Sequence, residues 1–257
     1  MSRIWFIKLL RNESVITYKF LSKMKYIYTP YVWFVGGLSF IFISMYELIG
    51  VKFTTPEKLF PFVSRFFRFL LKILFIRVKV EYHEEIDTKK TYIFMPNHSS
   101  FIDVVLAGAY IPVYVNALED ESHFNWFYYG KVIKAYEHIP ISKKNPRKAL
   151  QSFEIAKQYL KRGRSIIVFP EGHRSEDGKV KRFKKIPFRF VKDANVDLVP
   201  VGFSGLKKLR QKGKVWMSPG KLKIAYGKII TIKEIKELTT DELMEKTRNS
   251  VINLIEL

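Results

Sequence analysis

The sequence predicts an α/β domain that follows an N-terminal helical segment in contact with a membrane. Two observations support this fold class. A run of 21 residues, 26–46, carries no charge, and beyond about residue 78 short apolar runs alternate with helix-like segments. The chain has 257 residues, 47% of them hydrophobic, which is enough to bury a full core. We therefore divide it into an N-terminal membrane-anchoring segment, residues 1–78, and an α/β domain, residues 79–257.

The uncharged run has the dimensions of a membrane segment. At roughly 1.5 Å per residue, a helix of this length is about 30 Å long, which is the thickness of a bilayer core. The run is too long for the apolar part of a signal peptide, and no cleavage pattern follows it. A buried helix of a soluble core remains the alternative. Aromatic side chains gather at one end, as in an interfacial belt: Tyr26, Tyr28, Tyr31 and Trp33.

The charges around the run predict how it meets the membrane. Lys and Arg near a span stay cytoplasmic, so a single span would translocate one basic cluster. Pro30, Gly36 and Gly37 also weaken the run as one rigid helix. We expect residues 1–50 to form two membrane-embedded helical segments that enter and leave on the cytoplasmic side, with a plain transmembrane helix as the alternative. Both flanks are basic: Lys8, Arg11, Lys19, Lys23 and Lys25 precede the run, and Lys52, Lys58, Arg65, Arg68 and Lys72 follow it.

The overall charge limits the possible partners. The chain has 45 Lys and Arg against 24 Asp and Glu, a net charge of +21 that attracts nucleic acid, anionic lipid or an acidic protein. No RNA-binding, zinc-finger or helix-turn-helix pattern is present, and a long neutral run is foreign to such modules, so we exclude nucleic acid. Cysteine is absent. This excludes disulfides, thiolate metal sites and a cysteine nucleophile, and favours a cytosol-facing location.

The elements of the α/β domain can be placed along the chain. Strands are predicted at 78–82, 92–95, 165–169 and 196–203, and a strand or strand pair at 221–232. A helix is predicted in the stretch 145–163, with Asn145 as its N-cap, Pro146 in its first turn and Lys161, Arg162 and Gly163 closing it. Another runs from Thr240 to the C-terminus. In such folds, sites lie where strand ends run into loops.

The first motif, FMPNHSSFIDVV at 94–105, follows the second predicted strand. If Ser100 caps a helix, Asp103 occupies the third helical position and forms half of a capping box, which is a purely structural interpretation. In one regular helix, residues five apart point about 140° away from each other. His98 and Asp103 can therefore meet only if His98 lies in the preceding turn. A carboxylate on one imidazole nitrogen then fixes the tautomer and prepares the other to accept a proton from a hydroxyl.

The second motif, IIVFPEGHRS at 166–175, also follows a strand. Gly172 lets the backbone approach a ligand closely. Arg174 has the planar fork that binds phosphate in a bidentate manner, and it occupies the same strand-end position as His98. Lysines at 143–144 and 184–185 add positive charge, although a solvated surface is the favoured interpretation of either pair taken alone.

Together these segments resemble the 1-acylglycerol-3-phosphate acyltransferase family, glycerolipid acyltransferases with an NHxxxxD block. The resemblance runs from about residue 80 to 205 and implies the family's fold, a mixed sheet flanked by helices behind a membrane-binding N-terminal segment. The blocks match in order: Asn97, His98 and Asp103 the first; Phe169, Pro170, Glu171, Gly172, Arg174 and Ser175 the third, usually FPEGTRS; Phe183 and Lys184 the FK that follows; and Val199, Pro200 and Val201 the fourth.

The resemblance implies a reaction. His98, oriented by Asp103, would take the proton from the free hydroxyl of lysophosphatidic acid, which attacks an acyl thioester and becomes phosphatidic acid. No metal, cofactor or acyl-enzyme is required, and the cosubstrate is acyl-ACP or acyl-CoA. Because acyl carrier protein is acidic, the net charge of +21 favours it as a partner.

The resemblance also assigns the other site residues. Arg174, Lys143 and Lys184 would hold the acceptor phosphate, and Glu171 and Gly172 would shape the turn of the second motif.

Three departures from the family pattern leave the acceptor open. Lys143 stands where the family has an arginine, Glu119 lies in a stretch where many members have a lysine, and His173 replaces a threonine. One alternative is therefore a related acyltransferase acting on glycerol 3-phosphate or another lyso-lipid, and another is a non-catalytic lipid-binding membrane protein. A hydrolase using Ser99 or Ser100 is less favoured because no GxSxG motif is present.

Overall fold

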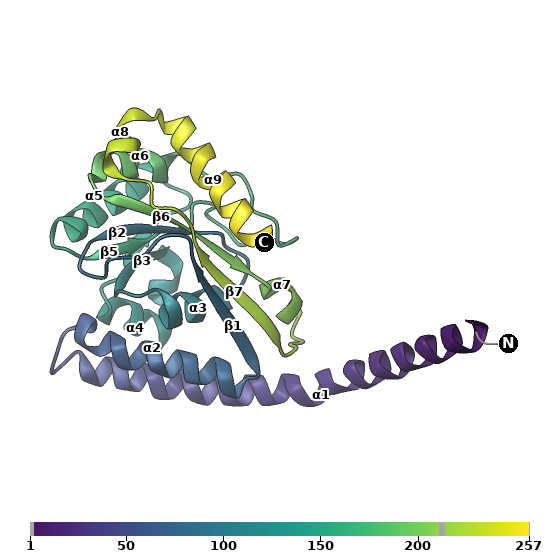
Figure 1. Ribbon diagram of the computed structural model, residues 1–257. Coiled ribbons are helices and arrows are strands. Elements are labelled where there is room, and N and C mark those ends of the chain that lie inside the picture. The colour runs from purple at the N-terminus through teal and green to yellow at the C-terminus, as the bar shows by residue number, and fades with distance from the viewer. Residues whose placement is uncertain (1–2, 211–213, 257) are drawn as a thin grey trace.

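The computed structural model describes residues 3–210 and 214–256, and side chains within 25–210 and 214–255. In this part of the chain, a seven-stranded sheet lies between two groups of helices (Figure 1). Its order is β1-β7-β6-β2-β5-β3-β4. The strands are β1 (Ile76–Tyr82), β2 (Tyr92–Pro96), β3 (Val115–Asp120), β4 (Ile139–Ile141), β5 (Ser165–Ile167), β6 (Asp197–Ser204) and β7 (Gly220–Tyr226).

The sheet is mixed. All neighbouring strands are parallel except β6 and β7, which are antiparallel, so β7 and β1 run opposite to the other five. The predicted fold class, a mixed sheet flanked by helices, is confirmed. The helices are α1 (Arg3–Gly50), α2 (Pro56–Ile73), α3 (Ile102–Tyr110), α4 (Tyr129–Ala135), α5 (Pro146–Lys161), α6 (Lys185–Ala194), α7 (Leu206–Leu209), α8 (Ile232–Glu237) and α9 (Thr240–Glu256), with a 3₁₀ turn at Glu121–Asn125.

The hydrophobic core is divided between the two faces of the sheet. Alternate residues of β2 point to opposite faces: Phe94 packs with α1, α2 and α3, whereas Ile93 and Met95 pack with α5, α6 and α9. Every residue of β2 is buried. This strand is therefore the centre of the domain, and its carboxyl end, where the first motif begins, has a fixed position.

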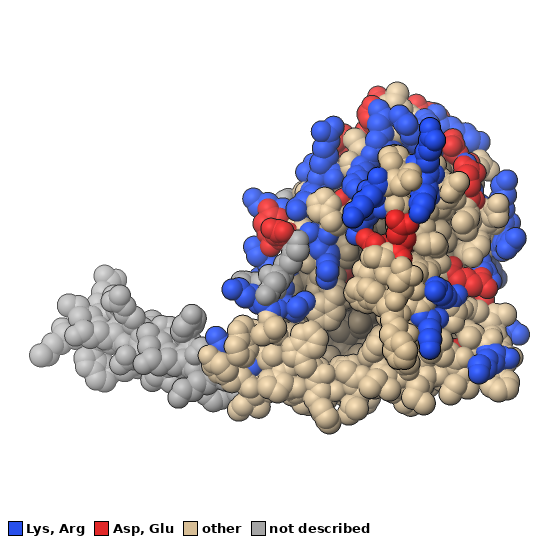
Figure 2. Space-filling view, turned by 180° about the vertical axis from the view of Figure 1, so that it is seen from behind, with Lys and Arg blue, Asp and Glu red and all other residues tan. Residues whose placement is uncertain are grey.

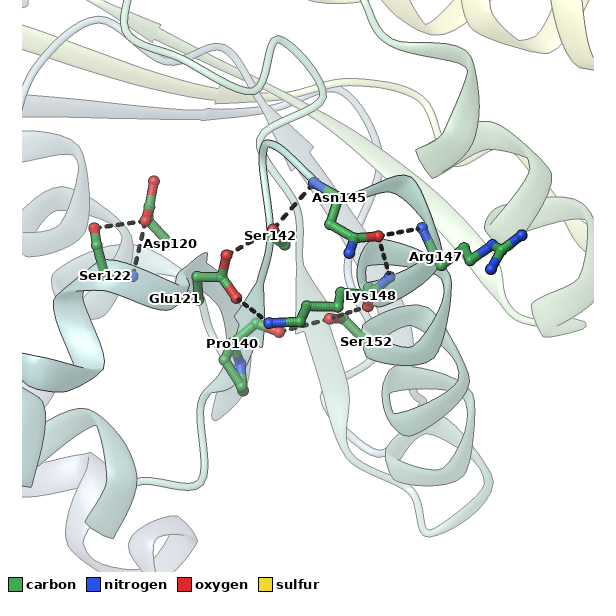
Figure 3. A network of polar contacts seen from close by, with 9 residues as sticks. All are labelled: Asp120, Glu121, Ser122, Pro140, Ser142, Asn145, Arg147, Lys148 and Ser152. Atoms are coloured by element: carbon green, nitrogen blue, oxygen red, sulfur yellow. Dashed lines mark hydrogen bonds and ion pairs between the residues drawn. The ribbon is translucent and has the colours of Figure 1, made fainter.

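Most predicted elements are present. Asn145 caps α5 as expected, since its side chain accepts hydrogen bonds from the Arg147 and Lys148 N–H groups (Figure 3). The stretch 221–232, predicted as a strand or strand pair, contains one strand, β7, followed by a single β-bridge at Ile230. Helix α8 begins after Thr231, at the end of this stretch. The Thr231 hydroxyl accepts from the Glu234 N–H, and this cap explains why a helix begins there.

The prediction of two helical segments within residues 1–50 is wrong. One helix, α1, runs through Pro30, and the chain turns only after Gly50. Helix α2 then begins with Pro56 in its first turn and packs alongside α1 (Figure 1). Proline and glycine lower helix stability locally, but tertiary contacts offset this. The Tyr28 and Tyr31 hydroxyls donate to the Leu74 and Ile73 carbonyls, at 2.5 and 2.8 Å.

The pair of helices α1 and α2 is continuous with the domain. Tyr28 and Val32 of α1 and Leu71 of α2 belong to the same buried cluster as Phe94 and Leu106. The division of the chain into residues 1–78 and 79–257 stays a prediction. Within the described residues, the segment Lys25–Gly50 of α1 is the one helix that is long and apolar enough to cross a membrane by length and composition.

A partly buried histidine predicts acid sensitivity. The Ala117 N–H donates to His138 Nδ1 at 3.2 Å, and burial lowers the pKa of His138 from 6.5 to about 4. Between these values the unfolded chain binds the proton and the folded protein does not. Stability should therefore fall by as much as about 3 kcal/mol as the pH falls from 6.5 through 4. The stabilities of wild type and His138→Asn, measured by denaturant melts at pH 7.5 and 4.5, should differ mainly at the lower pH. An equal loss of stability in both proteins between these pH values would contradict this.

Candidate functional site

The two motifs meet where the connections of two neighbouring strands diverge. Strands β2 and β5 are parallel neighbours. From β2 the chain passes through α3 to β3, beyond β5, whereas from β5 it passes through α6 to β6, beyond β2. Helices α3 and α6 belong to opposite faces of the sheet. Such a divergence leaves a crevice at the carboxyl ends of the strands, and His98 and Glu171 lie there, as the sequence predicts.

His98 and Asp103 are in direct contact. Their Nδ1 and Oδ2 atoms are 2.7 Å apart. The same oxygen accepts hydrogen bonds from the Ser99 and Ser100 N–H groups, at 2.8 and 2.9 Å. Because a carboxylate only accepts, Nδ1 carries the proton and Nε2 keeps its lone pair. Asp103 is fully buried, and it both closes the turn before α3 and orients His98, so the two interpretations of this motif are compatible.

Neighbouring side chains fix the histidine ring and its loop. The rings of His98 and Phe169 are 4.3 Å apart between centroids. The His98 side chain remains 21% exposed, so a ligand can reach it. Asn97 ties the loop to β6, because its side chain donates to the Phe203 carbonyl at 3.0 Å and accepts from the Phe203 N–H at 2.7 Å. His98 is thus held on a rigid backbone.

Glu171 joins the two motifs. Its carboxylate accepts from the His98 N–H at 2.7 Å and from the Lys181 N–H at 2.9 Å, and the Ser175 N–H donates to the His98 carbonyl at 2.8 Å. Burial raises the pKa of Glu171, and the two N–H donors oppose that shift. Both carboxylate oxygens bind backbone, which supports a role in shaping the turn and argues against direct contact with a substrate.

Gly172 leaves room for the side chain of Lys184 against the turn. Its φ of +74° lies in the left-handed region that favours glycine, and a Cβ there would be 2.7 Å from both Cε and Nζ of Lys184. The Lys184 N–H donates to the Pro170 carbonyl at 2.9 Å. The structure therefore brings Lys184 to the second motif, as the sequence predicts.

Arg174 lies beside a basic residue that the sequence analysis missed. Its side chain is exposed, and among the described residues it forms no ion pair. Burial lowers the pKa of Arg210, and the charge of Arg174 lowers it further, so the two guanidinium groups are close enough to repel each other. Arg210 stands in a stretch of many lysines, and nothing in its spacing distinguishes it from a solvated charge.

Lys143 does not join this group. It follows β4, at the edge of the sheet, and β5 and β3 lie between β4 and β2. Its Nζ is 2.8 Å from Asp120 Oδ2. Burial would raise the pKa of Asp120, but hydrogen bonds from Lys143 and Ser122 outweigh it and hold the pKa far below its usual value. Figure 3 shows the neighbouring network, in which Glu121 accepts from the Ser142 hydroxyl at 2.6 Å. A role for Lys143 in phosphate binding stays a prediction.

Glu119, one of the departures from the family pattern, forms an ion pair with His123 four residues later. The His123 ring also lies 4.4 Å from that of Trp126 between centroids. The sequence analysis missed this second histidine–carboxylate pair, because Glu119 ends a strand and His123 lies in the 3₁₀ turn after it, so no helical spacing relates them. Within the described residues, no group of three or more acidic or histidine side chains is arranged to hold a metal ion.

Comparisons with known proteins agree with this architecture. Over 189 residues the chain is 27% identical to a 1-acyl-sn-glycerol-3-phosphate acyltransferase of Cocos nucifera, covering 73% of this chain and 58% of that protein. Over 231 residues it is 25% identical to the chloroplastic 1-acyl-sn-glycerol-3-phosphate acyltransferase LPAT1 of Arabidopsis thaliana, covering 87% and 63%. The chain thus spans about three fifths of the length of these relatives.

A solved structure has the same fold. The crystal structure of the 1-acyl-sn-glycerophosphate (LPA) acyltransferase PlsC from Thermotoga maritima superposes with a TM-score of 0.79 at 23% identity, covering 92% of this chain and 96% of that one. Residues 77–204, from the start of the sheet to the end of β6, match the family model described as Acyltransferase. With both motifs assembled at one edge of the sheet, we conclude that this domain of the chain belongs to the Acyltransferase family.

Proposed function

We propose that the protein transfers a fatty acyl group from an acyl carrier thioester to the free hydroxyl of lysophosphatidic acid, giving phosphatidic acid. The observation that carries the proposal is the buried Asp103 carboxylate 2.7 Å from His98 Nδ1, at the crevice of an acyltransferase-type domain. This contact leaves Nε2 of an accessible ring free to take a proton.

The reaction needs no further group. Nε2 of His98 removes the hydroxyl proton as the acceptor oxygen attacks the thioester carbonyl. The carbon–sulfur bond then breaks, and the leaving sulfur takes the proton from His98 Nε2, which gives the free thiol and restores the neutral ring. Asp103 keeps the ring in the required tautomer and stabilises its positive charge during the transfer. We propose no metal, no cofactor and no covalent acyl-enzyme.

The charges of the site suit a phosphorylated acceptor. Lys184 lies beside Gly172, in the turn that also carries Arg174, so two cationic side chains belong to the second motif. A phosphate monoester has about −1.5 to −2 charge at pH 7 and binds a guanidinium fork well. Lys143 could contribute only by leaving Asp120.

The donor is acyl-ACP or acyl-CoA, and both are anionic. The chain's net charge of +21 attracts either donor to the protein, and the strongly acidic acyl carrier protein is attracted most. Figure 2 shows a hollow above the helical base of the molecule, bordered by uncharged side chains, with Lys and Arg gathered above it.

The acceptor is a membrane lipid, and the two N-terminal helices supply a surface for reaching it. The apolar part of α1 is only 28% buried. We propose that α1 and α2 together anchor the protein in the cytoplasmic leaflet without crossing it, since basic residues flank both ends. The exposed apolar side chains include Ile27, Phe34, Leu38, Ile41, Phe42 and Met45 of α1, Phe53 of the turn, and Phe69 of α2.

This anchor predicts that both ends of α1 lie on the same side of the membrane. Cysteines introduced at Ser2 and at Lys89, in a chain that has none of its own, should both react with an impermeant maleimide on the cytoplasmic face of sealed vesicles. Lys89 is exposed in a turn before β2 and serves as the marker of the domain. Reaction of Ser2→Cys from the opposite face would establish a span and exclude the proposed anchor.

A panel of acceptors tests the proposed function. Purified protein is given a labelled acyl thioester with lysophosphatidic acid, glycerol 3-phosphate, lysophosphatidylglycerol or monoacylglycerol, and the products are separated. Lysophosphatidic acid should give the highest kcat/KM. Preference for glycerol 3-phosphate or for another lyso-lipid would favour the corresponding alternative. No transfer to any acceptor, with lipid binding retained, would indicate a non-catalytic lipid-binding protein.

A further inference from the structure

Arg210 is held on a platform built by two distant segments. Its guanidinium carbon lies 4.7 Å from the ring centroid of Phe101 and 5.7 Å from that of Trp33. The two rings stack, with centroids 6.1 Å apart and planes 13° from parallel. Phe101 belongs to the first motif, three residues after His98, and Trp33 belongs to α1. Cation–π contacts therefore bring Arg210 to the side of the crevice that faces the membrane helices.

Hydrogen bonds fix this arrangement. Arg210 Nε donates to the Lys214 carbonyl at 2.9 Å, and Trp33 Nε1 donates to the Val215 carbonyl at 3.0 Å. No carboxylate within the described ranges, 25–210 and 214–255, is paired with Arg210. One face of the guanidinium thus lies on aromatic rings and Nε is occupied, so the two terminal nitrogens are the donors left without a partner among the described residues.

The surroundings of Arg210 are cationic. Arg174 lies close enough to disfavour the charge of Arg210. A cavity of about 460 Å³ beside Arg210 has no acidic residue in its lining. Holding like charges together without a counter-charge is unfavourable, and a bound anion would remove that cost. The cavity is lined by Lys25, Lys207, Lys208, Leu209, Arg210, Lys214, Trp216 and Ser218.

We propose that Arg210 is a second phosphate-binding arginine of the acceptor site, which together with Arg174 selects lyso-lipids whose headgroup is a phosphate monoester. This inference rests on the proposed function and specifies its acceptor. Two guanidinium groups match the two charges of a monoester, whereas a phosphodiester headgroup carries one. Because Trp33 belongs to α1, this site includes a residue of the membrane anchor. The headgroup would therefore be bound where the lipid enters from the leaflet.

Steady-state kinetics of Arg210→Gln test the proposal, with lysophosphatidic acid as the monoester and lysophosphatidylglycerol as the diester. The KM for lysophosphatidic acid should rise about tenfold or more, while the KM for the thioester stays unchanged. The preference for monoester over diester in kcat/KM should fall by a similar factor. Arg210→Lys keeps the charge but loses the planar fork and the stacking. Its KM for lysophosphatidic acid should lie between those of the wild type and Arg210→Gln.

The matched control is Arg189→Gln, which removes an exposed guanidinium from α6 on the other face of the sheet. It should leave both KM values and the acceptor preference unchanged. An unaltered KM for lysophosphatidic acid in both Arg210 variants, or an equal rise for the diester, would overturn the assignment. Wild-type protein that does not acylate lysophosphatidic acid would instead refute the proposed function, so the two failures are distinguishable.

Discussion

Replacing His98 by alanine is expected to lower kcat for acyl transfer by a factor of about 10²–10⁴, because a positioned general base contributes that much. Its ring is partly exposed and packs on Phe169 alone among aromatic rings of the described chain. The variant should therefore melt close to wild type. Rates measured under saturating acceptor and thioester check the prediction, and a residual kcat above about a tenth of wild type would contradict a base at this position.

Asp103→Asn provides the matched test of the carboxylate's charge. The amide keeps the shape of the buried carboxylate, and its oxygen can take the place of Oδ2, which contacts His98 Nδ1 and accepts from the Ser99 and Ser100 N–H groups. The tautomer of His98 is then kept, but the negative charge that stabilises the protonated ring during the transfer is lost. The rate should fall, less far than in His98→Ala, with KM values retained. Full activity would show that the 2.7 Å contact is only structural.

Arg174→Ala is expected to raise the KM for lysophosphatidic acid, or to lower kcat/KM, by roughly tenfold or more, because a charge-assisted contact to phosphate is lost. The KM for the thioester should not change. Lys143→Ala is the informative comparison, since Lys143 already pairs with Asp120 away from the crevice. An effect of Arg174→Ala that is equally large on monoacylglycerol, which has no phosphate, would defeat the assignment.

The contact between His98 and Asp103 could be predicted from sequence because its geometry is local. His98 and Asp103 are five positions apart, and a turn followed by a helix leaves few ways to arrange them. Gly172 was similarly informative, since a positive φ favours glycine whatever surrounds it. The central strands β2 and β6 are buried apolar runs, so their positions were evident from composition.

The features that sequence analysis missed depend on contacts between distant segments. Arg210 is one of 45 basic residues, and only its position over Phe101 and Trp33 distinguishes it. Strand β3 contains charged residues and β4 has only three residues, so neither had a strand-like pattern. The continuity of α1 through Pro30 was missed because helix propensity does not include packing against α2.

Release of thiol and formation of phosphatidic acid, measured together, test the central claim most directly. Purified wild-type protein in lipid vesicles is supplied with an acyl thioester, with and without lysophosphatidic acid. Thiol and phosphatidic acid should appear in equal amounts, both only when the acceptor is present, and His98→Ala should suppress both together. Thiol released without the acceptor would indicate hydrolysis, and phosphatidic acid formed at the wild-type rate by His98→Ala would contradict the proposed mechanism.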